Sequence, residues 1–203
     1  MFFLLDDKEN KVETIVTNNT KIMIIKANET AAIIVDVQEK LMTAMYNKEM
    51  VEENVNRLAA GLKLLEVPTI VTQQYTKGIG MTIPSVMETI GEDFSYMEKT
   101  SFGIYGEDPI KEAVDGLGKK NIIVCGTETH VCVLQTCIQL KAAGYQPIMV
   151  VDACGSRHEI DRLFGIERAK QEGVIITTYE ALLFELMGGS TCPVFRQISK
   201  IVK

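Results

Sequence analysis

The sequence lacks any run of Lys or Arg longer than a pair, and its formal net charge is −6 with a pI near 5.1. Because nucleic-acid binding needs concentrated positive charge against phosphates, we expect no nucleic-acid partner. The sequence also lacks an apolar stretch of the ~20 residues that a membrane-spanning helix needs. Its apolar start, Met1–Leu5, is followed at once by Asp6, Asp7 and Glu9, whereas a signal peptide has a basic start and a longer apolar core. These absences predict a protein of the cytoplasm with no membrane partner.

Histidine and paired cysteines are scarce as well. The chain has two histidines and five cysteines, and no two cysteines have the CxxC spacing. Zinc sites built from Cys and His use ligands paired at short spacings, and a disulfide framework needs an even number of cysteines. We therefore expect no metal, no cofactor and no disulfide.

From Ala31 onward, short apolar runs alternate with amphipathic stretches, a pattern typical of a parallel sheet covered by helices. Residues 1–28 are mixed and polar and could form a short hairpin or a partly ordered arm, so we place one domain at residues 29–203. The expected strands are 32–37, 68–72, 121–125, 147–151 and 174–178. The expected helices are 50–65, 108–117, 131–143, 160–172, 179–187 and 193–202. Repeated strand–helix units predict a three-layer α/β domain with right-handed crossovers.

Ligand sites in such sheets lie at the carboxyl ends of the strands, so polar residues after the strands are the chemical candidates. Asp36 ends the apolar run 33–37, where a carboxylate costs free energy unless it is paired or borders a site. Lys99 lies in the irregular, glycine-rich stretch 76–107, and a loop region of this length is more often functional than idle. The structural alternatives are a capping carboxylate for Asp36 and a surface position for Lys99.

Cys132 follows the strand 121–125 and a short turn, at or near the start of the next helix. The partial positive charge at a helix N-terminus lowers the pKa of a thiol and favours the thiolate. Position therefore predicts a nucleophile that is active near neutral pH, with an inert buried thiol as the alternative. For the other cysteines, Cys125, Cys137, Cys154 and Cys192, we expect the inert role.

These residues and their flanks resemble the isochorismatase-like cysteine hydrolase family, within which the similarity is greatest to isochorismatase-domain proteins of unsettled substrate. The resemblance covers about residues 30–203 and implies a three-layer α/β/α fold with a six-stranded parallel sheet. The matching segments occur in the family's order along the chain: IIVDVQ (33–38), EKTSF (98–102), GTETHVCV (126–133) and VDACGSR (151–157).

The resemblance implies a catalytic triad that hydrolyses a small amide-like C–N bond. Asp36 would take the thiol proton, Lys99 would hold the thiolate and orient Asp36, and Cys132 would attack to form a thioester. The resemblance also implies a cis peptide between Thr127 and Glu128. The backbone N–H groups of Glu128 and Cys132 would then form an oxyanion hole.

Two departures from family patterns narrow the expected activity. Nicotinamidases of this family carry an Asp/His metal cluster after the second strand, whereas residues 72–78 (TQQYTKG) contain no histidine, so we expect no catalytic metal. True isochorismatases, which cleave a vinyl ether, lack the nucleophilic cysteine, so Cys132 disfavours that activity. We expect the small-molecule substrate to contact Gln38, Gln74, Tyr75, Phe102 and Thr127.

Two functions of other classes stay open. One is a non-catalytic binding or scaffold protein, which the intact triad disfavours. The other is a redox sensor in which Cys132 is oxidised and resolved by Cys125 or Cys137. Reactivity of Cys132 toward a thiol reagent well below pH 8.5 would favour the enzyme.

Two further contacts are expected outside the site. Asp152 and Arg157 are expected to form a structural ion pair. The apolar segments 1–5 and 193–202 could supply the interface of a homo-oligomer, whose stoichiometry the sequence does not indicate.

Overall fold

The computed structural model describes residues 24–203. The hairpin or arm expected in residues 1–28 therefore falls mostly outside the described residues. The chain is already part of the packed domain at Ile25, which is buried and whose backbone N–H donates to Glu185 Oε1 at 2.8 Å. A single 3-10 turn, η1 (Ala27–Glu29), then leads into the first strand.

Six parallel strands form one sheet in the order β3-β2-β1-β4-β5-β6. This confirms the predicted fold class. The short edge strand β3 was missed by the pattern analysis because its sequence, MEK, has two charged residues and no apolar run. The strands are β1 (Thr30–Val35), β2 (Thr69–Gln74), β3 (Met97–Lys99), β4 (Asn121–Thr127), β5 (Gln146–Gly155) and β6 (Ile175–Thr177).

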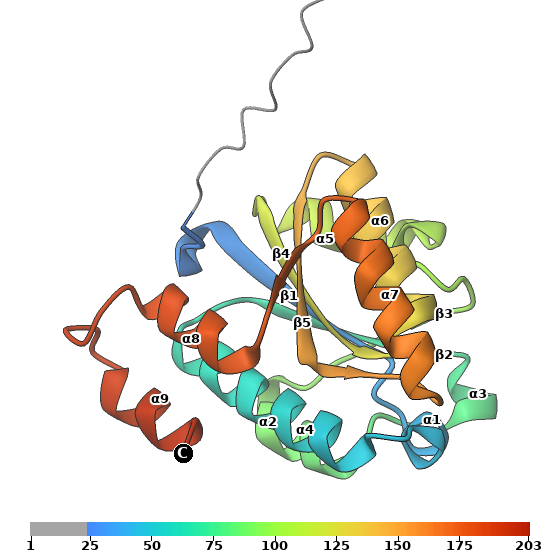
Figure 1. Ribbon diagram of the computed structural model, residues 1–203, viewed down its shortest axis with the longest axis horizontal. Helices are drawn as coiled ribbons and strands as arrows, with labels where there is room; N and C mark the ends of the chain where they lie inside the picture. The colour runs from blue at the N-terminus through green and yellow to red at the C-terminus, as the bar shows by residue number, and fades with distance from the viewer. Residues whose placement is uncertain (1–23) are drawn as a thin grey trace, which may run out of the picture.

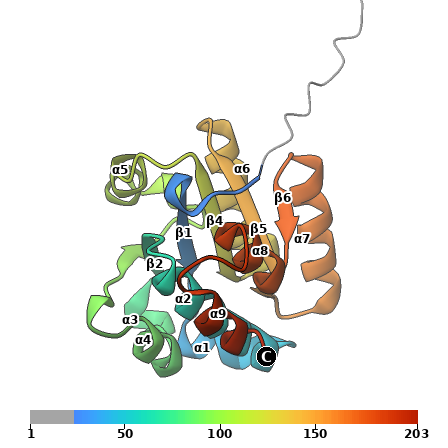
Figure 2. The same ribbon diagram turned by 90° about the vertical axis from the view of Figure 1, so that its left-hand side faces the viewer.

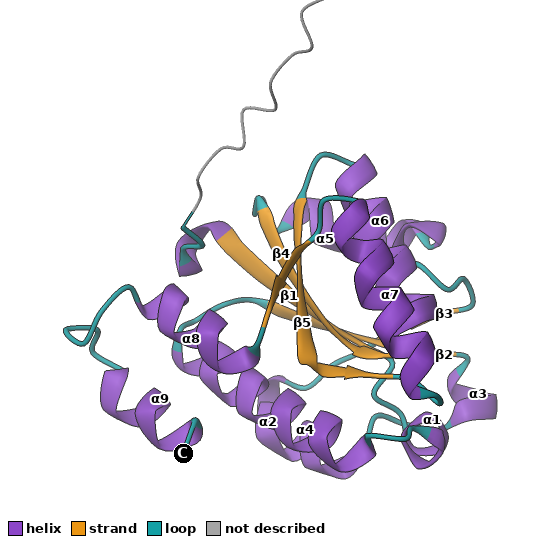
Figure 3. Ribbon diagram, viewed as in Figure 1, coloured by secondary structure: helices purple, strands orange, loops and turns teal. Residues whose placement is uncertain are grey.

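Helices cover both faces of the sheet, as Figures 1 and 2 show, with α5, α6 and α7 on one face and α2, α8 and α9 on the other. Figure 3 shows the same three layers by element type. The short helices α1, α3 and α4 were not predicted. The helices are α1 (Glu39–Ala44), α2 (Lys48–Leu64), α3 (Thr76–Ile79), α4 (Pro84–Ile90), α5 (Asp108–Gly116), α6 (Leu134–Ala142), α7 (Glu159–Gln171), α8 (Tyr179–Met187) and α9 (Phe195–Ile201).

The strand order reverses between β1 and β4, because the chain runs outward from β1 through β2 to β3 and outward from β4 through β5 to β6. Every residue of β1 and β4 is buried, as their continuous apolar runs predict. Val35 and Gly126 face each other where the two strands end. A Cβ on Gly126 would lie 2.0 Å from the Val35 carbonyl oxygen, so glycine is required there. Such a reversal point opens a crevice at the carboxyl ends of the strands.

Candidate functional site

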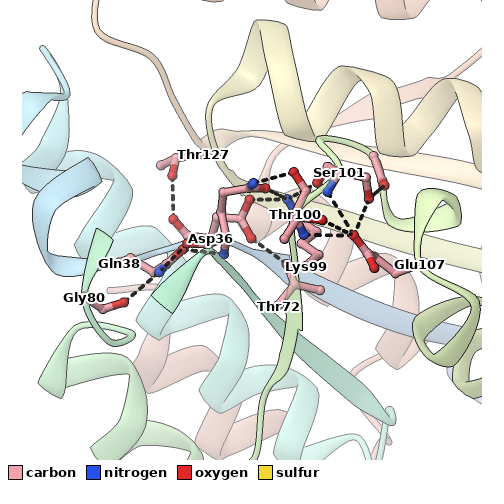
Figure 4. A network of polar contacts seen from close by, with 11 residues as sticks. Asp36, Gln38, Thr72, Gly80, Lys99, Thr100, Ser101, Glu107 and Thr127 are labelled. Carbon is pink, nitrogen blue, oxygen red and sulfur yellow. Dashed lines mark hydrogen bonds and ion pairs between the residues drawn. The ribbon is translucent and has the colours of Figure 1, made fainter. Parts of the chain in front are cut away.

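Asp36 and Lys99 form a buried ion pair at this crevice (Figure 4). Asp36 directly follows β1, and Lys99 is the last residue of β3, two strands away. The Asp36 Oδ2 to Lys99 Nζ distance is 2.6 Å, and neither side chain is exposed. A buried charge is tolerated only when an opposite charge lies beside it. Lys99 therefore allows Asp36 to be buried, and Asp36 allows Lys99 to be buried.

The backbone and neighbouring hydroxyl groups hold Asp36 in an unusual conformation. Its φ of +51° is rare for a residue other than glycine. The Thr72 hydroxyl donates to Asp36 Oδ1 at 2.8 Å, and the Thr127 hydroxyl donates to the Asp36 carbonyl oxygen at 2.6 Å. Burial raises the pKa of the Asp36 carboxyl, against the opposing effect of Lys99. A carboxylate with a raised pKa is a better proton acceptor.

Two side chains fix the Lys99 ammonium and its loop. Lys99 Nζ donates to Gln74 Oε1 at 2.7 Å and to the Ser101 carbonyl oxygen at 3.2 Å. Glu107 Oε1 in turn accepts from the backbone N–H groups of Thr100 and Ser101 at 2.8 and 2.9 Å, and from both of their hydroxyl groups (Figure 4). These bonds lower the pKa of Glu107 to about 2. Glu107 therefore anchors the loop that carries Lys99.

Cys132 lies in η4 (Thr129–Val133), a π-helical turn that runs directly into α6. Its side chain is buried, with 7% of the residue exposed. Burial raises the pKa of the thiol to about 12, and the Asp36 carboxyl next to it adds to the rise, while Lys99 and the backbone N–H of Glu128 oppose it. The lowered pKa predicted from the position near a helix start is therefore wrong. Burial outweighs the helix terminus.

Glu128 joins the turn that carries Cys132 to the loop after β5. The peptide bond between Thr127 and Glu128 is cis. The Glu128 carboxylate is held on both oxygens by Arg157, with Arg157 Nη2 3.0 Å from Oε1 and Nε 3.1 Å from Oε2. The predicted pair of Asp152 with Arg157 is wrong, because Asp152 Oδ1 instead accepts the Tyr179 backbone N–H at 2.9 Å. Glu128 and Arg157 are 29 positions apart in the sequence, so no local pattern predicts this pair.

A cavity of about 390 Å³ opens beside Cys132. Its wall combines the thiol, three polar or charged side chains, and apolar side chains. Two of the expected substrate contacts, Gln74 and Phe102, line it. The remaining lining residues are Leu41, Ile79, Glu128, Val131 and Arg157. Leu41 and Ile79 belong to α1 and α3, which were not predicted, so their place in the wall had no signal in the sequence.

Three expected substrate contacts are not in the wall of this cavity. Gln38 is buried and its amide is used internally: Nε2 donates to the carbonyl oxygens of Gln74 and Gly80 at 3.1 and 2.6 Å, and Oε1 accepts the Gln74 N–H. Thr127 is buried and its hydroxyl bonds to Asp36. Tyr75 is 52% exposed and is not among the lining residues. Gln38 and Thr127, which follow or end strands, thus form hydrogen bonds with the loop backbone instead of lining the cavity.

The described part of the chain contains no cluster of three or more His, Cys, Asp or Glu side chains placed to hold a metal ion. No helix within residues 24–203 is long and apolar enough to cross a membrane. His130, one of the two histidines, has its Nδ1 3.1 Å from the Ser156 hydroxyl oxygen.

Comparison with known proteins gives consistent matches. The family model described as the Isochorismatase domain matches residues 30–181. Isochorismatase domain-containing protein 2 of Bos taurus is 36% identical over 169 residues, which cover 83% of this chain and 80% of that protein. The MAR1 ribonuclease structure from Caenorhabditis elegans has a TM-score of 0.84 at 35% identity, covering 89% of this chain and 92% of that one. The YcaC gene product of Escherichia coli, described as an octameric hydrolase of unknown specificity, has a TM-score of 0.83 at 24% identity and covers 89% of each chain.

Proposed function

Because this chain belongs to the isochorismatase family, which has a hydrolase fold, we propose that it is a metal-independent cysteine hydrolase acting on a small amide-like C–N bond. The observation that carries the proposal is the convergence of Asp36 and Lys99 on Cys132, whose thiol lines a cavity. Cys132 is the nucleophile, Asp36 the general base and acid, and Lys99 the cation that holds Asp36 ionised.

The attack begins from a neutral thiol. With the pKa of Cys132 raised to about 12, a free thiolate would place a second anion beside Asp36. Proton transfer from Sγ to the Asp36 carboxylate therefore accompanies formation of the bond between sulfur and the substrate carbonyl carbon. The raised pKa of Asp36 favours this transfer. The total charge of the acid, ammonium and thiol stays constant until the oxyanion forms.

The tetrahedral oxyanion needs donors in the low-dielectric cavity. The Glu128 backbone N–H already acts on the sulfur and lowers its pKa, so we assign it, with the Cys132 N–H, to the oxyanion hole. Loss of one such donor in comparable enzymes reduces kcat by about 10²–10³-fold. The C–N bond then breaks, the protonated Asp36 gives its proton to the leaving amine, and the thioester remains on Cys132.

Water completes the cycle. Asp36, ionised again, takes a proton from a water molecule that adds to the thioester carbonyl, and the acid is released as the thiol recovers its proton from Asp36. One amide and one water molecule thus give one acid and one amine.

The test is turnover of a panel of small primary amides, measured as ammonia released, by the wild type and Cys132→Ala. Addition of hydroxylamine during turnover should divert the thioester to a hydroxamate in the wild type alone. Full activity in Cys132→Ala would remove the nucleophile assignment. Absence of turnover over the whole panel, with an unreactive Cys132, would favour the binding or scaffold alternative.

RNA hydrolysis is a second candidate, since a structure 35% identical to this chain is described as a ribonuclease. The net charge of −6 opposes it, and among the described lining residues the one cation, Arg157, already pairs with Glu128. Incubation with a labelled single-stranded RNA oligonucleotide tests it. Cleavage that Cys132→Ala abolishes would establish this activity over the amidase.

We also propose that the chain assembles with copies of itself, as the octameric YcaC product does. Light scattering coupled to size-exclusion chromatography measures the stoichiometry. A location in the cytoplasm remains a prediction from the sequence.

A further inference from the structure

The charges around the cavity are paired in two separate sets. Behind Cys132, which lines the cavity, the fully buried Asp36 carboxylate faces the Lys99 ammonium at 2.6 Å. In its wall, Glu128 and Arg157 hold each other through two contacts of 3.0 and 3.1 Å, and Glu128 Oε2 also accepts the Arg157 backbone N–H at 3.1 Å. Each set has no net charge. No unpaired charge therefore remains among the described residues that line the cavity.

The other polar wall group, the Gln74 amide, is also used internally. Its Oε1 accepts from Lys99 Nζ at 2.7 Å, and its Nε2 donates to the Thr100 carbonyl oxygen at 2.7 Å. What remains for the part of a substrate away from the reacting carbonyl is apolar. These wall residues are Leu41, Ile79, Phe102 and Val131.

We propose that the site selects carboxamides whose acyl group is uncharged and apolar, and that the Glu128–Arg157 pair sets this selectivity by cancelling the only charges in the wall. The proposal rests on the hydrolase function proposed above. A carboxylate on the acyl group would lose its water in the cavity without gaining a free cation, which is strongly unfavourable. Arg157 is thus a specificity-determining residue that acts through its attachment to Glu128.

Neutralising one member of the Glu128–Arg157 pair should change which charge the site prefers on the acyl group of the substrate. In Glu128→Gln the backbone N–H stays in place, but the Arg157 guanidinium is freed to meet an anion. In the double variant Glu128→Gln/Arg157→Gln the wall is again neutral. This double variant is the matched control, because it keeps the Glu128 change and removes only the freed cation.

Alkylation of Cys132 by iodoacetamide and iodoacetate measures this selectivity without requiring turnover. Both reagents form the same S–CH₂ bond and release iodide, with the thiol proton lost to solvent, and they differ in one charge. In the wild type, the ratio of the iodoacetamide rate to the iodoacetate rate should exceed that of N-acetylcysteine by roughly tenfold. Glu128→Gln should lower the ratio by roughly tenfold, and the double variant should restore it. Mass spectrometry of the Cys132 peptide gives both rates at one pH.

Turnover supplies the second readout. The wild type should release ammonia from isovaleramide and not from succinamate, whereas Glu128→Gln should gain activity toward succinamate. A wild-type labelling ratio equal to that of N-acetylcysteine, or no change in the ratio for a folded Glu128→Gln variant, would overturn the selectivity while leaving the hydrolase intact. If Cys132 reacts with neither reagent and no amide is hydrolysed, the hydrolase and the selectivity both fail.

Discussion

Two regions of this molecule bury thiols, and they differ in what lies beside the sulfur. Cys125, Cys137 and Cys154 are enclosed in the core, and burial raises the pKa of each. Burial also raises the pKa of Cys132, to about 12. The distinguishing feature of Cys132 is an adjacent carboxylate, Asp36, together with an open cavity. A cysteine can therefore be prepared for attack by a base within reach, without being stored as a thiolate.

The largest expected effect comes from removing Lys99, the ion-pair partner of Asp36. Only the thiol beside this pair, Cys132, should be affected, and the core thiols should not. Lys99→Met leaves the buried Asp36 without a partner, which should lower the free energy of unfolding by about 3–5 kcal/mol and turnover by about 10²–10⁴-fold. Asp36→Asn/Lys99→Met, which buries no charge, should regain most of the stability and none of the activity. Urea denaturation and ammonia release measure the two quantities. Equal stability of the single and double variants would show that the pair is not energetically coupled.

The second prediction concerns pH. Because the pKa of Cys132 is about 12, the thiolate fraction should grow about tenfold per pH unit between pH 7 and 10. The alkylation rate of Cys132 should rise with it, whereas the rate of a cysteine in a short unstructured peptide should level off above its pKa of roughly 8.5. Cys125, Cys137 and Cys154 should react only when the protein unfolds. A plateau for Cys132 near pH 7 would contradict this dependence. It would show either a stored thiolate, as the helix position predicts, or proton transfer to Asp36 during alkylation, and only the second should be lost in Asp36→Asn.

The third prediction tests whether a small displacement of η4, the turn that carries Cys132, lowers kcat. A Cβ on Gly165 of α7 would lie 2.9 Å from the His130 Cα, so Gly165→Ala should push the turn that carries Cys132. We expect a loss of about 1–3 kcal/mol in stability from overpacking and a several-fold fall in kcat. Gly116→Ala in α5 is the matched control, since nothing lies within 4 Å of its Cβ. Unchanged kinetics in Gly165→Ala would mean that η4 tolerates displacement.

The smallest expected effect is at Glu107, which anchors the Lys99 loop from outside the site. The pKa of Glu107 is lowered to about 2 in the folded state, so its stabilising contribution is present above its unfolded pKa of roughly 4.3 and is lost as the pH falls through 2. The urea midpoint of Glu107→Gln should therefore lie slightly below that of the wild type at pH 7, and the difference should shrink between pH 5 and pH 2. If the difference between the two urea midpoints stayed constant with pH, ionisation of Glu107 would not contribute to stability.

Much of the fold could be predicted from local patterns of apolar residues in the sequence. The apolar runs of β1 and β4 and the apolar periodicity of α2 and α8 were recognisable because a buried strand and an amphipathic helix each repeat over several residues. The edge strand β3 was missed because it has no apolar run, and the helices α1 and α3 were missed because six and four residues are too few to show a helical repeat. These short elements carry Lys99, Leu41 and Ile79 to the site.

Only part of the site was open to prediction. Asp36 and Cys132 were chosen as candidates because each lies at or after a predicted strand, and Lys99 because the motif around it in the irregular stretch 76–107 resembles the family's. Gln38 and Thr127 occupy equally suggestive positions, yet their side chains bind the loop backbone. Hydrogen-bond partners of this kind depend on which loops meet in space, and one sequence does not specify them.

The sequence by itself determined the alternation of strands and helices, and with it the edge of the sheet where an acid, an ammonium and a thiol would meet. Tertiary structure decided the protonation state of that thiol, because burial and a neighbouring carboxylate act through space and outweigh the helix start that local position indicates. It also decided the wall of the cavity, where folding brings Glu128 and Arg157, 29 positions apart in the sequence, into a pair that cancels both charges.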